Sequence, residues 1–463
     1  MALLLRIGAA AVLPNAAHPD ETFQTREPAH RLAYGYGIVP WEFREGVRSW
    51  VFPAFLAGVM RATDWMGKGS QGYLLGIAIV LSAISLTAVW FAFAWAHRSG
   101  GINSAVVAAA GAAVWFELVY YAPKALNEVV AAHLMLPALY LGTGAEPPRA
   151  RGRLFAAGLF YGLTVALRPA LVPAVAAGVA WQCWRDWRGC LPVLLAGILP
   201  PIALFGLVDA LTWSYPFQSF IRYFWINIVQ GRSATFGVEP WYWYLLSVGR
   251  RLGPILVLAV VGARRSPFLA VVALVILVSH SLIPHKEDRF IYPLVPIALT
   301  LAALGLLDAA AWLSRRLPRL QSPGTATAVG VLFMASISVW LGSEFPLWGN
   351  NAGTLAAMEA LSTDPAVCGI GLRGIPYTKS GGYTFLHRDV PIVVVLRDAQ
   401  LKTLGPALSA VLTEIPLKDR QFAPAGCRHG ACVYRRSGPC RAPGPENEIN
   451  HYLERKGLPW APH

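Results

Sequence analysis

Two adjacent acids follow the apolar N-terminal stretch of the chain, in the run His18-Pro19-Asp20-Glu21. A carboxylate directly after a membrane span lies at the membrane–water interface, where it can act as a general base or bind a cation. The alternative is a solvated loop in which Pro19 and Asp20 are turn residues. For the two acids taken alone, the solvated loop is the better-supported interpretation.

A second polar group, His285-Lys286-Glu287-Asp288-Arg289, separates two apolar stretches. Long side chains at helix ends reach toward water, and this would explain the group without any ligand. Lys286 and Arg289 also have the chemistry to bind a phosphate, the first as a point charge and the second as a planar fork. The run alone leaves both interpretations open.

Three polar residues, Lys124, Asn127 and Glu128, have the spacing i, i+3 and i+4. This spacing places them on one face of a helix. Glu117 lies inside an apolar stretch. An acid inside a membrane span indicates a functional site, although the sequence does not name its partner.

The segment 212–243 is rich in Trp and Tyr and follows Asp209, which ends an apolar stretch. Such aromatic residues usually form a belt at the membrane interface. Tyr215 and Trp241 could instead stack against a sugar or guide a prenyl chain. In the predicted topology, Asp209 lies at the outer side of the membrane, as does the aromatic segment.

The elements that carry these residues belong to a membrane protein. The chain has 463 residues, of which 55% are hydrophobic and 14% charged, and its mean hydropathy is +0.47. Soluble proteins average about 25% charged residues. The net charge is +14, but excess Lys and Arg are common in the cytoplasmic loops of membrane proteins. No basic run with interleaved aromatics occurs, so we expect the lipid bilayer and not nucleic acid as the partner.

Runs of roughly 20 apolar residues predict about eleven spans. They lie near 1–14, 72–96, 102–121, 128–144, 154–167, 169–183, 190–211, 244–262, 267–283, 290–313 and 324–342. With the N-terminus inside, the inside loops collect Arg98, Arg149, Arg151, Arg153, Arg185, Arg188, Arg264, Arg265, Arg315, Arg316 and Arg319. This is the positive-inside pattern. A single span over 154–183 would reverse every later loop, so the charges favour two passes there.

The first outer loop then covers 15–71, within a membrane domain that we place at 1–342. The remainder, 343–463, is less hydrophobic and is predicted to be a small α/β domain on the outer side, because runs such as Val390–Leu396 read as strands between turn residues. Four of the six cysteines lie in this tail. They could form disulfides if the tail lies in an oxidising compartment. No convincing zinc ligand set occurs.

Several motifs occur together and in the order of a known family. The matching runs are His18 to Glu21, Glu27 to His30, Trp41-Glu42, Arg48-Ser49, Lys124 to Glu128, Arg168-Pro169, Asn227 to Trp241, His285 to Phe290 with Pro293, and Tyr383 with His387 to Pro391. They resemble the α-mannosyltransferases of GPI-anchor and N-glycan-precursor assembly, which use dolichyl-phosphate mannose, have the GT-C fold and form glycosyltransferase family 22. The tail motif is similar to the branch that adds the third mannose of the GPI anchor.

The chain departs from the family pattern at a few positions. Pro40 precedes Trp41 where Thr is usual, Lys124 stands where Arg is usual, and Pro216 follows Tyr215 where Gly is usual. Asp209 is also farther from Tyr215 than in the family. These departures bear on the acceptor more than on the reaction. The many Arg and Ala residues and the short loops suggest a bacterial member.

The resemblance implies an inverting transfer of a mannosyl, or other hexosyl, residue on the non-cytoplasmic face, at the periplasmic side of a bacterial inner membrane. The donor would be a polyprenyl-phosphate sugar and the acceptor a glycan or glycolipid. Asp20 would be the base and Glu21 its helper, with no metal or cofactor. The residues expected to bind substrate are His18, Glu42, Arg48, Lys124, Asn127, Glu128, Arg168, Asp209, Tyr215, Asn227, Trp241, His285, Lys286, Glu287 and Arg289.

Two other classes of protein fit a polytopic chain with charged loops. One is a transporter or flippase of a lipid-linked or small polar substrate. Transporters usually hold their sites near the bilayer midplane between repeated halves, whereas this chain shows no repeat and its charges lie at interfaces. The other is a structural subunit, in which Asp20 and Lys286 could be replaced without effect.

Overall fold

The computed structural model describes residues 1–12, 15–144, 150–315, 323–442, 444 and 448–456. Two compact units form, each from segments far apart in sequence. The helical unit comprises Met1–Ile7 and Leu81–Phe345, and the loop–tail unit comprises Gly8–Val80 and Pro346–His463. The first outer loop is therefore grouped with the tail. Arg149, Arg316 and Arg319 of the predicted inside loops lie outside the described residues.

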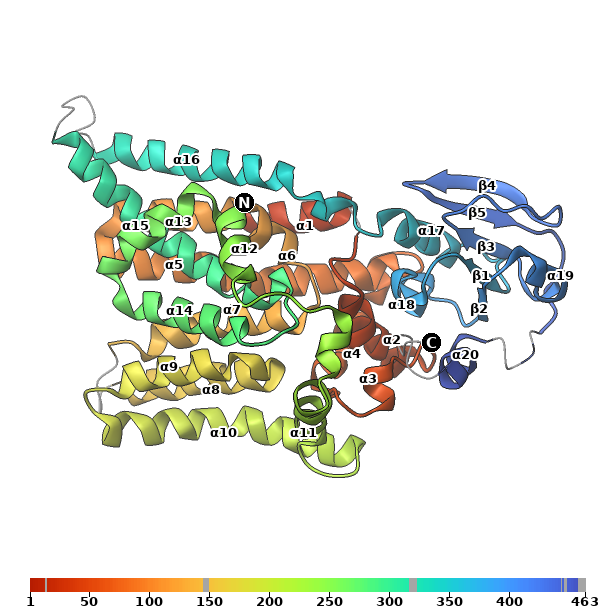
Figure 1. Cartoon of the computed structure of the whole chain (residues 1–463), viewed down its shortest axis with the longest axis horizontal. Coiled ribbons are helices and arrows are strands. Elements are labelled where there is room, and N and C mark those ends of the chain that lie inside the picture. Colours follow the sequence, from red (N-terminus) through yellow and green to blue (C-terminus); the bar gives the residue numbers. More distant parts are fainter. Residues whose placement is uncertain (13–14, 145–149, 316–322, 443, 445–447, 457–463) are drawn as a thin grey trace. The chain divides into compact units, whose positions relative to one another are not determined.

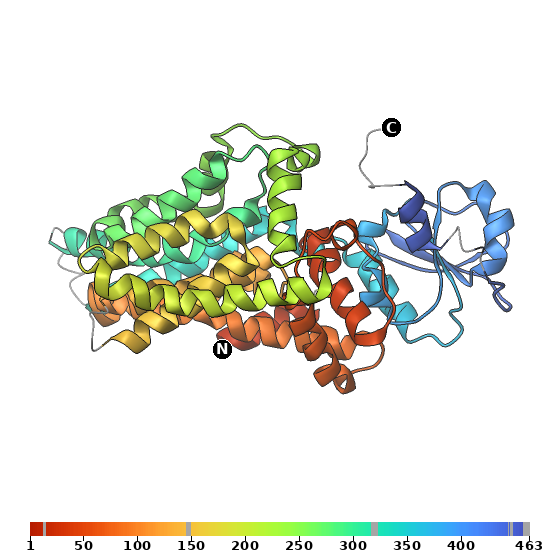
Figure 2. The same cartoon turned by 90° about the horizontal axis from the view of Figure 1, so that it is seen from below.

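The helical unit is built from apolar α-helices that pack side by side (Figures 1 and 2). In chain order they are α1 (Ala2–Val12), α5 (Gln71–Val114), α6 (Phe116–Tyr121), α7 (Asn127–Gly142), α8 (Arg151–Leu167), α9 (Val172–Cys183), α10 (Trp187–Thr212), α11 (Gln218–Phe224), α12 (Trp243–Leu252), α13 (Pro254–Gly262), α14 (Pro267–Ser281), α15 (Leu294–Ser314) and α16 (Pro323–Glu344). The residues of α1 and α5 are divided between the two units.

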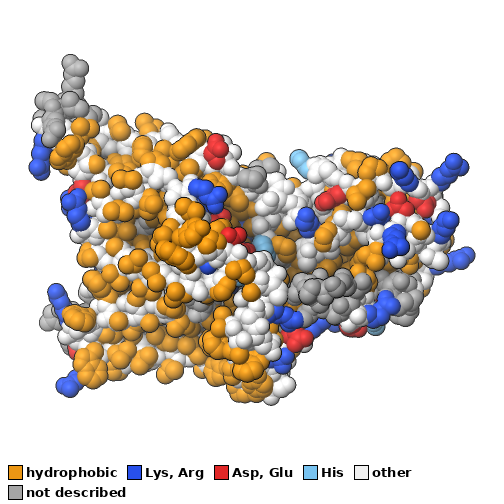
Figure 3. All heavy atoms as spheres, in the orientation of Figure 1, with side chains coloured by type: hydrophobic (Ala, Val, Ile, Leu, Met, Phe, Trp, Pro, Cys, Tyr) orange, Lys and Arg blue, Asp and Glu red, His pale blue; other side chains and the backbone are white. Residues whose placement is uncertain are grey.

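Hydrophobic side chains cover much of the visible face of this unit (Figure 3). On α10, for example, Leu199, Leu207 and Leu211 are exposed. An apolar surface of this extent on regular helices suits contact with lipid, because helices satisfy their own backbone hydrogen bonds.

Small residues let neighbouring helices approach closely. A methyl group on Gly158 of α8 would lie 2.3 Å from the carbonyl oxygen of Leu194 in α10. A methyl group on Gly262 of α13 would lie 1.9 Å from the carbonyl oxygen of Leu301 in α15. Close packing through small residues is typical of helices in membranes.

Four helices are long and apolar enough to cross a membrane within the described residues: α5, α10, α15 and residues 324–344 of α16. A fifth candidate is the pair α12 and α13, and three shorter apolar helices cover Ala2–Val12, Pro169–Cys183 and Pro267–Ser281. Our count of eleven spans thus stays a prediction. The expected interruption at Arg168-Pro169 is present, since α8 ends at Leu167 and α9 begins at Val172.

The helices break at one predicted turn and inside two predicted spans. Gly101 has φ +80° inside α5, at the expected turn between 72–96 and 102–121. The predicted span 244–262 is bent by 99° between α12 and α13, because Gly253 has φ +52° and Pro254 follows it. The stretch 102–121 breaks after Val114, where the guanidinium of Arg6 donates to the carbonyls of Ala112 and Ala113 at 3.0 and 2.9 Å.

After the end of α1, the loop–tail unit contains a π-helical turn, η1 (Glu21–Arg26), that continues directly into α2 (Glu27–Tyr34). Single π-helical turns are frequent at functional sites. The remaining elements are α3 (Trp41–Arg44), α4 (Val51–Thr63), α17 (Ala352–Ser362), β1 (Ile370–Arg373), α18 (Gly382–Leu386), β2 (Ile392–Val395), α19 (Leu401–Leu404), β3 (Ala410–Thr413), β4 (Ala423–Arg428), β5 (Ala431–Arg435) and α20 (Ile449–Lys456).

The five strands form one sheet of order β2-β1-β3-β5-β4. β2 and β3 run parallel to β1, whereas β5 and β4 are antiparallel neighbours at the other edge. The prediction of a small α/β region near Val390–Leu396 is therefore confirmed, with β2 at Ile392–Val395. Its core also includes Phe23 and Ile38 of the first loop, which pack with tail residues such as Met358 and Leu386.

All four tail cysteines are paired. Cys368 bonds Cys440, and Cys427 bonds Cys432 across the β4–β5 hairpin. Cys183 and Cys190, which flank the predicted inside loop of Arg185 and Arg188, are buried and form no disulfide among the described residues.

Candidate active site

The loop–tail unit holds the two acids of the first loop in different surroundings. Glu21 is fully buried and contacts the guanidinium of Arg26 at 2.6 Å, while its other oxygen accepts the amide of Ala17 at 2.8 Å. The side chain of Asp20 is 23% exposed, and its Oδ1 lies 3.4 Å from Nδ1 of His18. Asp20 is thus the accessible carboxylate of the two, whereas both oxygens of the Glu21 carboxylate contact neighbouring groups.

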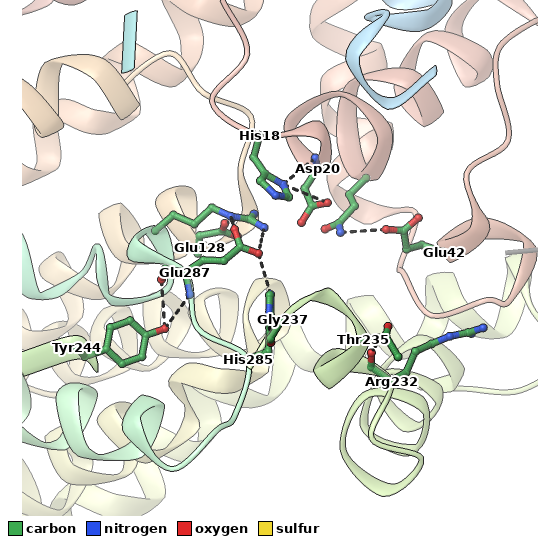
Figure 4. A network of polar contacts seen from close by, with 12 residues as sticks. His18, Asp20, Glu42, Glu128, Arg232, Thr235, Gly237, Tyr244, His285 and Glu287 are labelled. Carbon is green, nitrogen blue, oxygen red and sulfur yellow. Dashed lines mark hydrogen bonds and ion pairs between the residues drawn. The ribbon is translucent and has the colours of Figure 1, made fainter. Parts of the chain in front are cut away.

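Glu42 is a third carboxylate of this unit and lies near Asp20 (Figure 4). Its Oε1 accepts a hydrogen bond of 3.0 Å from Nε2 of Gln24. Burial, followed by the negative charge of Asp20, raises the pKa of Glu42 to about 7, although the charge of Arg48 acts in the opposite direction. The unit therefore brings together His18, Asp20, Glu42 and Arg48, and it places one acid where it titrates near neutral pH.

In the helical unit, the loop after α14 is fastened by Lys286. Its ammonium donates to the carbonyls of Ile283 at 2.6 Å and Glu239 at 3.1 Å, with that of Pro284 at 3.5 Å. His285 adds a contact of 3.0 Å between Nδ1 and the carbonyl oxygen of Gly237 (Figure 4). Burial lowers the pKa of Lys286. These contacts join the predicted phosphate-binding run to the end of the aromatic segment 212–243.

Arg289 lies at the centre of a buried ionic network. Its guanidinium contacts Glu128 at 2.5 Å and forms two bonds to Glu287, of 2.7 and 3.1 Å. Glu287 also contacts Nε2 of His285 at 3.0 Å, and this hydrogen bond raises the pKa of His285 despite burial. Arg168 lies 3.9 Å from the second oxygen of Glu128.

Aromatic residues complete these surroundings. The guanidinium of Arg168 stacks 4.5 Å above the ring of Phe290, and the ammonium of Lys124 lies 5.1 Å from the ring of Tyr120. The hydroxyl of Tyr244 lies 3.2 Å from both the amide and the carbonyl of Glu287. The cation–π contacts of Arg168 and Lys124 offset part of the cost of burying their charges.

Glu117 has its partner in Arg251 of α12, a residue that sequence reasoning missed. Arg251 contacts Glu117 and, at 2.7 Å, Asp288. The hydroxyl of Ser247 donates to the same Asp288. The amphipathic pattern of α12 contained the signal, because Tyr244, Ser247 and Arg251 recur at helical spacing and lie on its buried face.

The other predicted residues of the helical unit lie outside the Arg289 network. Asp209 is buried and accepts hydrogen bonds from the amide and the hydroxyl of Ser219 at 2.9 and 2.5 Å, so it fixes the start of α11. Tyr215 and Trp241 are exposed. Asn227 donates to the carbonyl of Tyr223 within its own helical turn, and Asn127 is the first residue of α7.

Comparison with solved structures identifies the fold. Over 96% of the chain, the structure is similar to ArnT from Cupriavidus metallidurans bound to undecaprenyl phosphate, with a TM-score of 0.61, 13% identity and 98% of that chain covered. The apo state of the same protein matches with a TM-score of 0.60 and 14% identity, over 95% of this chain and 97% of that one. The predicted all-α membrane architecture with a GT-C fold is confirmed.

Sequence comparison gives the family. The model of the Alg9-like mannosyltransferase family matches residues 1–364, and the chain belongs to that family. GPI mannosyltransferase 3 of Yarrowia lipolytica is 27% identical over 84% of this chain and 74% of its own length. GPI alpha-1,2-mannosyltransferase 3 of Mus musculus is 26% identical over 67% of this chain, which spans 58% of the mouse protein. The prediction of a membrane mannosyltransferase is thus confirmed at the level of the family.

Proposed function

We propose that this chain transfers a mannosyl residue from a polyprenyl-phosphate donor to a hydroxyl group of a lipid-linked or glycan acceptor, with inversion at the anomeric carbon. Membership of the Alg9-like mannosyltransferase family carries the proposal, since the matched region contains both Asp20 and the Arg289 network. The likeness to ArnT, whose structure holds undecaprenyl phosphate, supports a lipid-linked donor.

In the proposed reaction, Asp20 is the general base. It takes the proton of the acceptor hydroxyl while the hydroxyl oxygen bonds to the anomeric carbon and the bond from that carbon to the phosphate oxygen breaks. The products are the mannosylated acceptor and a polyprenyl phosphate. The partial exposure of Asp20 suits this role, whereas the two engaged oxygens of Glu21 suit a residue that holds the loop in place.

The leaving phosphate requires positive charge, and arginines supply it as planar forks. Arg289 is saturated by Glu128 and Glu287, and the ammonium of Lys286 by backbone carbonyls. Arg168 is less engaged, since its nearest carboxylate oxygen is 3.9 Å away and its Nε has no hydrogen-bond partner among the described residues. We therefore assign the first contact with the phosphate to Arg168, with Lys286 and Arg289 fixing the geometry around it.

We also place the reaction on the non-cytoplasmic side of the membrane, in a bacterial inner membrane at the periplasmic face. The two disulfides of the tail support this placement, because disulfides persist in oxidising compartments. Cys183 and Cys190, which form no disulfide among the described residues, flank the arginine-rich loop that the positive-inside pattern assigns to the cytoplasm. Nucleotide sugars are confined to the cytoplasm, so a donor on the outer side is lipid-linked.

The test is a transfer assay in proteoliposomes that contain the purified chain and a glycolipid extract as acceptor. With polyprenyl-phosphate mannose labelled in the sugar, we expect label in a new lipid or glycan product and release of polyprenyl phosphate. GDP-mannose should give no product. Movement of the labelled lipid across the bilayer without covalent transfer would contradict the proposal and support a flippase.

A further inference from the structure

The tail contacts the first loop at successive points along the loop. The contacts are the amide of Ala16 to the carbonyl of Asn350 (3.3 Å), the ring of Phe23 against that of Tyr377 (5.3 Å between centroids), and the amide of Val39 to Oδ1 of Asn450 (2.9 Å). Both segments belong to the same compact unit. The loop that carries Asp20 therefore obtains much of its order from residues more than 300 positions away.

Glu27 makes the densest of these contacts. Its carboxylate is completely buried and accepts four hydrogen bonds: from the amide of Ile38 at 2.7 Å, the amide of Tyr383 at 3.0 Å, and the amide and hydroxyl of Thr384 at 2.8 and 2.6 Å. Burial raises the pKa of Glu27, and these hydrogen bonds act against that rise. Each oxygen accepts two donors, so the site is shaped for a carboxylate and not for an amide.

The backbone at Gly382 is shaped around the same carboxylate. Gly382 has φ +60°, and a Cβ atom there would lie 2.7 Å from the carboxyl carbon and one oxygen of Glu27. A glycine is needed for both reasons, since other residues rarely adopt this conformation and no space remains for a side chain. The tail and Glu27 thus fit each other at both the backbone and the side chain.

Two further contacts extend the junction, one from α2 and one from the start of α5. Nε2 of His30 lies 3.0 Å from Nδ1 of His387, and the hydroxyl of Tyr73 donates to the carbonyl of Thr384 at 2.5 Å. Burial, and then the neighbouring His387, lowers the pKa of His30 to about 3. His30 is therefore neutral at physiological pH, and the two rings do not repel each other.

Glu27 is also mechanically connected to Asp20. Asp20 directly precedes η1, which runs without a break into α2, where Glu27 is the first residue. Fixing Glu27 fixes this helical segment and, with it, the position of the Asp20 carboxylate. A misplacement of about 1 Å at a reacting group can cost about a hundredfold in rate.

We propose that Glu27 is a positioning residue that fastens the Asp20 loop to the tail, so that residues 382–387, which lie beyond the region matched by the family model, take part in setting the reaction geometry. The inference rests on the proposed role of Asp20 as base. It assigns the tail a role in the rate of transfer and not in binding of the donor.

Three variants and one control test the proposal. Glu27→Gln keeps the shape but places an NH₂ group against two donors. Thr384→Val removes only the hydroxyl bond, and Gly382→Ala adds a methyl group against the carboxylate. The control, Arg373→Gln, breaks the ion pair of 2.7 Å with Asp398, whose two members both lie in the tail.

Two measurements on the full-length chain are compared. Amide hydrogen exchange of residues 15–38 should rise about tenfold in Glu27→Gln, less in Thr384→Val, and not in Arg373→Gln. In the proteoliposome assay, kcat should fall about tenfold or more in Glu27→Gln while KM for polyprenyl-phosphate mannose stays within about twofold. Thr384→Val keeps the test valid if Glu27→Gln or Gly382→Ala fails to fold.

Unchanged exchange of residues 15–38 in both Glu27→Gln and Thr384→Val would overturn the proposal, as would faster exchange with an unchanged kcat. Equal losses in Arg373→Gln would also contradict it, because a general effect on the tail would then explain the result. If the wild-type chain transfers no mannose, the proposed function fails, whereas the exchange measurement still decides whether Glu27 holds the loop.

Discussion

In the helical unit, the buried carboxylates of Glu117 and Glu128 each contact an arginine, whereas in the loop–tail unit Glu27 and Glu42 receive their hydrogen bonds from neutral groups. The exception in the second unit is Glu21, which pairs with Arg26. An acid that faces a cation stays ionised and fixes geometry, while a buried acid without one takes up a proton more easily. The difference suggests that the helical unit supplies charge and the loop–tail unit supplies proton chemistry.

The largest expected effect is that of Asp20→Asn. The amide keeps the size of the side chain but cannot accept the proton of an acceptor hydroxyl, so we expect transfer to fall by about a thousandfold. The measurement is the initial rate of label transfer in proteoliposomes. A matched change at Glu21, Glu21→Gln, should instead lower the amount of folded protein, because it disturbs the contact with Arg26.

Retention of wild-type transfer by Asp20→Asn would exclude Asp20 as the base. It would also remove the reason for assigning proton chemistry to the loop–tail unit.

The next effect concerns the ion pairs of the helical unit. Arg251→Gln leaves Glu117 buried without its cation, and removing one partner of a buried pair costs about 3–5 kcal/mol. We expect a large fall in thermal stability, measured by unfolding of the protein in detergent micelles. The double variant with Glu117→Gln should recover much of it, since the fully buried charge is then removed and the other partner of Arg251, Asp288, is 32% exposed.

Arg265→Gln is the matched control for this pair. Arg265 contacts Asp308 at 3.0 Å, but its side chain is 48% exposed. Exposed pairs contribute about 0–1 kcal/mol. Equal losses at Arg251 and Arg265 would show that burial does not distinguish the two ion pairs.

Much of the helical unit could be predicted from the sequence, because its elements depend on local patterns. Apolar runs gave the helices, the arginine-proline pair gave the separation of α8 and α9, and the run His285 to Arg289 predicted a charged cluster. The amphipathic pattern of α12 places Arg251 on a buried face, but its pairing with Glu117 could not be predicted, because the two residues lie 134 positions apart and only the tertiary fold brings them together. The 99° bend after α12 was missed for a different reason: Gly253-Pro254 marks it locally, but a window of apolar residues does not record direction.

The loop–tail unit was harder to predict. The strands of the tail and the acids of the loop were recognised separately, but their common core and the four hydrogen bonds of Glu27 join segments at opposite ends of the chain. Glu27 was noted only as part of a motif. A glycine beside a buried acid gives no local signal, because the close contact exists only after folding.

A smaller effect is expected from the pH dependence of Glu42. Its pKa of about 7 lies above the ordinary value of 4.5, so the folded chain holds a proton that the unfolded chain has released. Stability should therefore fall by about 2–3 kcal/mol as the pH rises from about 4.5 through about 7. Glu42→Gln removes this loss, so the variant should gain stability relative to the wild type at about pH 8 but not at about pH 5.

The measurement is thermal unfolding of both proteins across this pH range. A parallel pH dependence in wild type and Glu42→Gln would contradict the raised pKa. Glu128→Gln serves as the contrast, because it should lower stability at all of these pH values by breaking the contact with Arg289.

The smallest effect tests the cysteines of the two units. The disulfide between Cys427 and Cys432 closes a loop of sequence separation 5, and so short a loop contributes about 2 kcal/mol in the chain-entropy model. Replacing both residues by serine should lower the stability of the loop–tail unit by about this amount. Transfer should stay within about twofold of the wild type, because β4 is exposed along its length and holds none of the proposed site residues.

The corresponding control replaces the buried Cys183 and Cys190, which form no disulfide among the described residues, by alanine. A reductant should leave the stability change caused by this replacement as it is. A reductant should destabilise the wild type and, through Cys368–Cys440, also the serine variant. If a reductant changes neither protein, the tail cysteines are unpaired in the membrane-bound chain. The difference between the tail cysteines and Cys183 with Cys190 would then no longer support opposite compartments for the tail and the arginine-rich loop.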